Sequence, residues 1–105
     1  GYASQVVASD DKTWFFHDHG GMANWIKDKS FKDNAKIWVM SKDTKKYIDG
    51  RLAWYSRTDI TPMKYGFGAY ENKQDGFIPF DEMAIKVLRN EDLRNPYIRK
   101  ELLGK

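Results

Sequence analysis

Short β-rich segments separated by polar turns constrain the fold of this chain more than any other feature. Residues 2–8 (YASQVVA) and 13–17 (TWFFH) flank the turn SDDK, and residues 36–41 (KIWVMS) and 47–57 (YIDGRLAWYSR) flank the turn KDTKK. β-Branched and aromatic residues favour strands, whereas Ser and Asp favour turns. The pattern predicts two β-hairpins, with a turn or bulge at Asp49-Gly50 in the second.

The segment after the first hairpin has the periodicity of a short helix. The pair Gly20-Gly21 interrupts the strand, and Met22, Trp25 and Ile26 then recur with the i, i+3, i+4 spacing of one helical face. We expect this helix to bury that face and to end near residues 29–31.

The second half of the chain combines a long loop with further extended and helical segments. Residues 58–66 (TDITPMKYG) lack a period and contain a proline, so we expect a loop. It leads into the extended stretch 65–71 (YGFGAYE), whose glycines leave room for a close neighbour. The acidic pair at 81–82 favours a helix N-terminus before an apolar stripe at positions 83, 84, 87 and 88. The charged segment 90–105 is expected to end in one or two partly packed helical turns.

The composition indicates one globular domain of mixed α+β structure. The chain has 105 residues, of which 41% are hydrophobic and 31% are charged, and we expect one domain over residues 1–105 with 90–105 as a C-terminal extension. Four Trp, six Tyr and six Phe residues can supply an aromatic core. The longest apolar runs, such as IWVM, are far shorter than the roughly 20 residues that span a bilayer.

Several functional classes are disfavoured. The formal charge is only +3 and the lysines are scattered among aspartates, so we expect no nucleic-acid binding. The absence of cysteine excludes disulfides, thiolate ligands and thiol nucleophiles within this chain. No GxSxG, HExxH, Walker or GxGxxG motif occurs, and a helix start explains the neighbouring carboxylates Asp81 and Glu82. We therefore expect a protein that is not an enzyme.

The stretch FFHDHGGM holds two histidines, a carboxylate and a methionine at the end of the first hairpin. If the strand continued, its alternation would place the imidazoles of His17 and His19 on one side and Asp18 on the other. Such a pair can chelate a transition metal, but histidines at a strand end can equally be exposed or hydrogen-bonded. Asp18 is better explained as a helix N-cap than as a ligand.

The methionines suggest which metal such a site would select. A thioether is a soft, neutral ligand that favours Cu(I) over zinc. Met22, Met40 and Met83 lie on periodic apolar segments, so core packing explains them. Met63 follows Pro62 in the long loop, where no periodic pattern accounts for it. Met63 is therefore the strongest thioether candidate.

Four segments in order, FFHDHGGM, KIWVMSKDTKKYIDGRLAWYSR, TPMKYGFGAYEN and FIPFDEM, resemble the NosL family of nitrous oxide reductase accessory proteins over about residues 2–83. The resemblance implies an α+β fold related to organomercurial lyases, with strand-strand-helix-strand units and a C-terminal helix. It also implies a periplasmic or extracytoplasmic copper chaperone, usually a lipoprotein, with no catalytic activity. Such a chaperone binds Cu(I) and passes it to nitrous oxide reductase or its maturation machinery in denitrification.

The resemblance also implies which residues hold copper. The TPM methionine of the family falls on Met63 and the GxM methionine on Met22, whereas an often cysteine-bearing turn appears here as residues 17–21 without cysteine. We therefore expect Met63 with His17, His19 or both as ligands, and Met22 in reserve. The family's lipobox cysteine and cysteine-methionine motif would precede Gly1, so we expect a mature or trimmed fragment whose lipid anchor lies outside this chain.

An alternative from another functional class stays open. A domain of the same fold could bind no metal and present its aromatic strand faces to a protein partner. The absence of cysteine favours this alternative.

Overall fold

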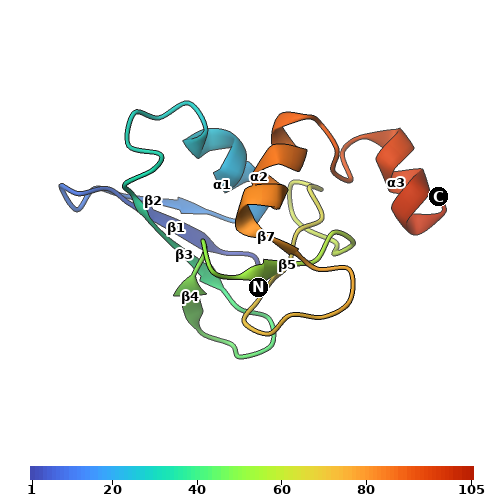
Figure 1. Cartoon of the computed structure of the whole chain (residues 1–105), viewed down its shortest axis with the longest axis horizontal. Coiled ribbons are helices and arrows are strands. Elements are labelled where there is room, and N and C mark those ends of the chain that lie inside the picture. The colour runs from blue at the N-terminus through green and yellow to red at the C-terminus, as the bar shows by residue number, and fades with distance from the viewer.

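Two antiparallel sheets and three helices form the structure, which is a computed structural model that describes residues 1–105 (Figure 1). The first sheet has the order β2-β1-β3-β4 and comprises β1 (Ser4–Val7), β2 (Thr13–Phe16), β3 (Lys36–Met40) and β4 (Tyr47–Asp49). The second sheet has the order β6-β5-β7 and comprises β5 (Trp54–Tyr55), β6 (Ala69–Tyr70) and β7 (Ile78–Pro79). The helices are α1 (His19–Ile26), α2 (Phe80–Leu88) and α3 (Pro96–Leu103). The prediction of a mixed α+β fold is confirmed at this level.

Both predicted hairpins are present. β1 pairs with β2, and β3 pairs with β4, in each case antiparallel. The second arm of the second hairpin is shorter than predicted, because the chain turns at Gly50 and Trp54 joins the other sheet. A Cβ on Gly50 would lie 2.5 Å from Cγ2 of Ile37, so this turn needs glycine to approach β3 closely.

The core lies between the helices and the inner faces of the sheets. α1 packs on β1, β2 and α2, whereas α2 packs on β5, and Figure 1 shows both helices on the same side of the first sheet. Met22 and Ile26 are buried and Trp25 packs against the core, which confirms the predicted apolar face of α1. Met83 and Val87 likewise anchor α2, but Leu88 is 67% exposed because it ends the helix beyond the core.

The predicted loop and C-terminal helix are also present. No strand or helix occurs between β5 and β6, and the longest irregular part of this connection includes residues 58–66. α2 begins with Asp81 and Glu82 in its first turn, as expected. α3 has no buried residue and lies at the opposite end of the molecule from the β1–β2 turn (Figure 1). No helix is both long enough and apolar enough to cross a membrane.

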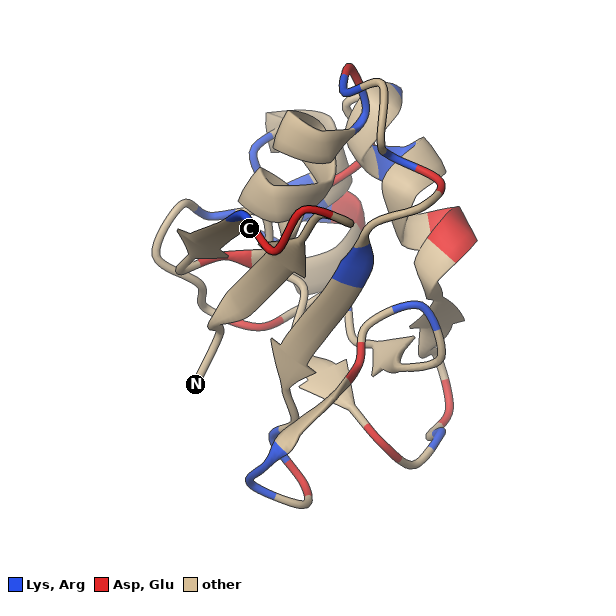
Figure 2. Ribbon diagram, turned by 90° about the vertical axis from the view of Figure 1, so that its left-hand side faces the viewer, with Lys and Arg blue, Asp and Glu red and all other residues tan.

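Charged residues of both signs are interspersed over the surface. Figure 2 shows lysines and arginines alternating with aspartates and glutamates along the loops and helices, with no large block of either sign. The scattered charge pattern of the sequence is therefore retained in three dimensions.

Candidate functional site

The corner between β2 and α1 contacts the loop that carries Met63, and one carboxylate makes the connection. Asp18 is fully buried, and its Oδ2 accepts hydrogen bonds from the Thr61 hydroxyl at 2.6 Å and from the Met63 backbone N–H at 2.8 Å. Its Oδ1 accepts from the Gly20 N–H at 3.1 Å, which confirms the predicted N-cap of α1. Asp18 therefore joins two segments that are more than 40 residues apart in the sequence.

The bonded loop continues this network toward the core. Thr61 is buried, and its hydroxyl oxygen also accepts a hydrogen bond from the Gly66 N–H at 3.1 Å. The Lys64 N–H donates to the Thr61 carbonyl at 3.0 Å, which closes a turn around Pro62 and Met63. The backbone position of Met63 is thus fixed from both sides of the turn.

Each glycine of the GGM segment makes room for one side chain of the second half of the chain. A Cβ on Gly20 would lie 2.1 Å from Cγ of Tyr65, a distance that no packing adjustment of a ring permits. A Cβ on Gly21 would lie 3.1 Å from Sδ of Met63. The glycine pair therefore allows α1 to seat against this loop, with the Met63 thioether over Gly21.

Met63 is the most accessible of the four methionines. Its side chain is 56% exposed, whereas Met22 and Met83 are fully buried and Met40 is half-buried. The expectation that Met22 serves packing is confirmed by its place in the hydrophobic core. Met63 is therefore the one methionine that lies mostly outside the core.

The two histidines lie in different environments, contrary to the prediction that their imidazoles share one side. His17 is exposed and His19 is fully buried. The alternation fails because β2 ends at Phe16 and Asp18 already caps a helix that begins at His19. Asp18 and His19, which were predicted to point to opposite sides, are both buried.

His19 is enclosed by aromatic and polar neighbours. Its Nδ1 is hydrogen-bonded to Oγ of Ser4 at 2.9 Å, and the rings of Tyr2 and Tyr55 meet it edge-on at centroid distances of 6.3 and 5.9 Å. Burial lowers its pKa to about 3, although Asp59 opposes this effect. The imidazole is therefore neutral at pH 7, and its buried Nε2 has no hydrogen-bond partner.

A second polar cluster, which the sequence did not predict, holds the start of the Met63 loop. Oδ2 of Asp59 accepts from Nζ of Lys42 at 2.7 Å and from the Tyr2 hydroxyl at 3.0 Å, and Oδ1 accepts from the Ser56 hydroxyl at 2.6 Å. A Cβ on Gly68 would lie 2.5 Å from Oδ2 of Asp59, which confirms the predicted close neighbour of this glycine. The loop is therefore anchored by Asp59 near its beginning and by Asp18 near its tip.

The corner contains one exposed histidine and one buried neutral histidine, and the loop contributes one exposed methionine. No group of three or more His, Asp or Glu side chains is placed to hold a metal ion jointly. A thioether with imidazole nitrogens forms a donor set suited to Cu(I). In comparisons with family models, curated proteins and solved structures, the chain has no match.

Proposed function

We propose that this chain is a NosL-like Cu(I)-binding accessory protein that carries copper for the maturation of nitrous oxide reductase. One observation supports the proposal above all others. The buried carboxylate of Asp18 accepts a hydrogen bond from the Met63 N–H at 2.8 Å, and the Met63 sulfur lies over Gly21, in the same corner segment as the two histidines. Asp18 connects FFHDHGGM with TPMKYGFGAYEN, which are two of the four segments that carry the family resemblance.

Met63 and His17 are the proposed primary ligands. Both side chains are exposed, so a Cu(I) ion bound by them could be transferred to a partner without unfolding the core. His19 is a proposed additional ligand through its unpartnered Nε2, but only after a local opening of the corner, since this atom is buried. Met22 is kept only as a reserve ligand, because its side chain lies within the core and would have to leave it to reach a metal ion. A site with few ligands, all of them neutral, suits a protein that must release its Cu(I) to a partner.

The finer fold assignment and the location belong to the same proposal. The order β1, β2, α1, β3 forms one strand-strand-helix-strand unit, as expected for a fold related to NosL and the organomercurial lyases. We place the protein in the periplasm or another extracytoplasmic compartment, with membrane attachment only through a lipid anchor outside this chain. Its partners would be copper and nitrous oxide reductase or its maturation machinery.

Competition for Cu(I) tests the ligand assignment. The purified chain is titrated with Cu(I) against a chromogenic chelator, together with the variants Met63→Leu and His17→Gln. Met63→Leu nearly conserves side-chain volume while it removes the sulfur, so a loss of affinity would report ligation rather than packing. Met40→Leu, in β3, is the matched control.

We expect Met63→Leu and His17→Gln each to weaken Cu(I) retention at least tenfold, and Met40→Leu to leave it unchanged. Acidification should release copper if His17 is a ligand, because protons compete with the metal for an imidazole nitrogen and do not compete for a thioether. The ligand assignment fails if the parent chain retains no Cu(I), or if Met63→Leu retains it as well as the parent.

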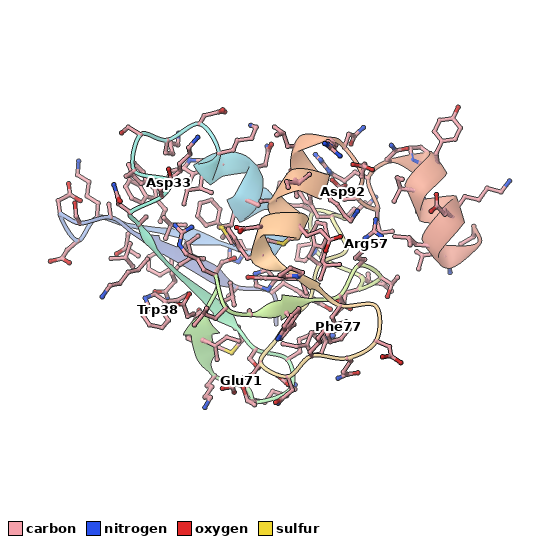
Figure 3. All side chains as sticks on the ribbon, viewed as in Figure 1. Asp33, Trp38, Arg57, Glu71, Phe77 and Asp92 are labelled. Carbon is pink, nitrogen blue, oxygen red and sulfur yellow. The ribbon has the colours of Figure 1, made fainter.

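One observation favours the alternative of a protein-interaction domain of the same fold that binds no metal. Phe15, Trp38 and Tyr47 are exposed on the face of the first sheet opposite the helices, and Phe15 and Trp38 both flank Gln5 across adjacent strands. Figure 3 shows Trp38 on the side of the sheet away from α1. For this alternative, Cu(I) would not change the melting temperature, whereas a bound metal raises it by mass action.

A further inference from the structure

We propose that a hollow between the Met63 loop and α3 binds an aliphatic carboxylate, such as the C-terminal residue of a peptide. The hollow has a volume of about 220 Å³ and is lined by aliphatic side chains from three segments together with two cations. These side chains are Ile60, Leu93, Leu103, Lys64 and Arg99. The inference is independent of copper binding.

The size and lining of the hollow select one apolar group. Ligand sites for drug-sized molecules occupy roughly 300–1,000 Å³, so this smaller hollow suits a single aliphatic side chain. Leu93 is buried and forms the floor, whereas Leu103 is partly exposed at one wall. Ile60 at the other wall is 94% exposed, although its loop is held by buried hydrogen bonds. A ligand that covers the Ile60 side chain would remove its apolar surface from water, which favours binding.

The charges at the hollow select an anion. Lys64 and Arg99 form no ion pair with any carboxylate. The hollow also contains Asp59, but both oxygens of this carboxylate accept hydrogen bonds and Oδ2 forms an ion pair with Lys42 at 2.7 Å. The unpaired charge that faces a ligand is therefore positive, and an arginine and a lysine can together bind one carboxylate.

The floor of the hollow is built in advance. The Leu93 N–H donates to the Tyr65 carbonyl at 3.2 Å, and Arg99 donates from Nη1 to the Leu93 carbonyl at 3.3 Å. Gly66 has a positive φ of 92°, and a Cβ there would lie 2.6 Å from Cδ1 of Leu93. Glycine at this position therefore seats Leu93, which in turn holds the Arg99 guanidinium beside the apolar floor. A preformed site loses little free energy to ordering on binding.

A hollow whose lining combines aliphatic side chains with two cations fits a carboxylate joined directly to an aliphatic group. A free carboxylic acid and a peptide C-terminus share this chemistry. An extended anionic membrane is less suited, because a concave hollow accepts an inserted side chain, whereas a bilayer surface requires protruding apolar groups. The geometry thus points to a small anion or a chain end.

Amide NMR titrations of the intact chain test the proposal with three probes of similar apolar size. The probes are 4-methylpentanoate for a free acid, N-acetyl-leucine for a peptide C-terminus and N-acetyl-leucine amide as the uncharged control. We expect saturable shifts at Ile60, Lys64, Leu93 and Arg99, and an affinity for N-acetyl-leucine at least tenfold higher than for its amide. Tighter binding of N-acetyl-leucine than of 4-methylpentanoate assigns a peptide end, and equal binding assigns a free carboxylate.

Charge variants complete the experiment. The double variant Lys64→Gln/Arg99→Gln should weaken binding at least tenfold, whereas Lys100→Gln, on the same helix but outside the hollow, should leave it unchanged. Arg99→Lys, which keeps the charge, controls for any fraying of α3. The proposal is overturned if the acids cause no saturable shifts at the hollow, if acid and amide bind equally, or if the double variant binds as well as the parent.

Discussion

Asp18 is predicted to contribute more to stability than any other carboxylate of this chain, and Asp18→Ala is the perturbation that shows it. The substitution removes the acceptor for three donors: the Gly20 N–H, the Thr61 hydroxyl and the Met63 N–H. Because Asp18 is fully buried, water cannot readily replace these bonds in a well-packed corner.

The magnitude follows from the individual bonds. Loss of an N-cap costs about 0.5–2 kcal/mol, and each buried donor left without a partner costs about 1–3 kcal/mol. Partial relaxation and entry of water reduce the sum, so we expect Asp18→Ala to lower the free energy of unfolding by about 3–5 kcal/mol. Asp18→Asn should cost less, about 2–3 kcal/mol, since its amide oxygen can still cap α1 while its NH₂ group faces the Met63 N–H.

Urea unfolding followed by tryptophan fluorescence measures both variants, with Asp75→Ala in an exposed loop as the matched control. The control should change the free energy of unfolding by less than about 0.5 kcal/mol. Hydrogen exchange of the Met63 amide adds a local readout, because its protection should be lost in both Asp18 variants. A loss of less than about 1 kcal/mol in Asp18→Ala, or an unchanged exchange rate at Met63, would refute the role assigned to Asp18.

Three further predictions concern the neighbouring groups. Gly20→Ala should destabilise the protein by about 3 kcal/mol or more, because the new Cβ would overlap the Tyr65 ring. Gly21→Ala should cost less than about 1 kcal/mol, since the end of the Met63 side chain can move and alanine favours a helix. Thermal unfolding compares the two variants. The pKa of His19 is lowered to about 3 in the folded state, so below pH 6.5 the unfolded chain binds more protons at this residue than the folded chain does. The free energy of unfolding should therefore fall on acidification, by about 2–3 kcal/mol between pH 6.5 and 4.5. His19→Gln should remove this pH dependence in urea unfolding, and an unchanged slope would contradict a buried neutral imidazole. Asp59→Ala should lower the free energy of unfolding by about 2–3 kcal/mol, and a cost equal to that of Asp75→Ala would contradict its anchoring role.

Local sequence patterns predicted the elements but not how they meet. The hairpins, the apolar face of α1 and the cap at Asp18 follow from residues within a few positions of one another, so turn chemistry and periodicity were sufficient. The second sheet was not predicted, because its strands are two residues long and carry no measurable alternation. The split of the second hairpin at Gly50 was predicted only as a turn or bulge.

The candidate site shows the same division. The sequence singled out Met63 because no pattern explained it, and the structure places it beside the histidine-containing corner. The bond from Asp18 to Thr61 could not be predicted, since it joins residues 43 positions apart. The different environments of His17 and His19 depend on where the helix begins, which a one-residue shift in the cap would change. The glycine pair was the available signal, because adjacent glycines at a helix start can indicate close approach of another segment.

X-ray absorption at the copper edge tests the proposal that the Met63 sulfur binds Cu(I) at this corner. The spectrum of the Cu(I)-loaded chain should require one sulfur scatterer together with at least one imidazole. In the Met63→Leu variant, loaded in the same way, the sulfur contribution should be absent. A parent spectrum fitted by nitrogen or oxygen alone, or a sulfur contribution that persists in Met63→Leu, would contradict the claim.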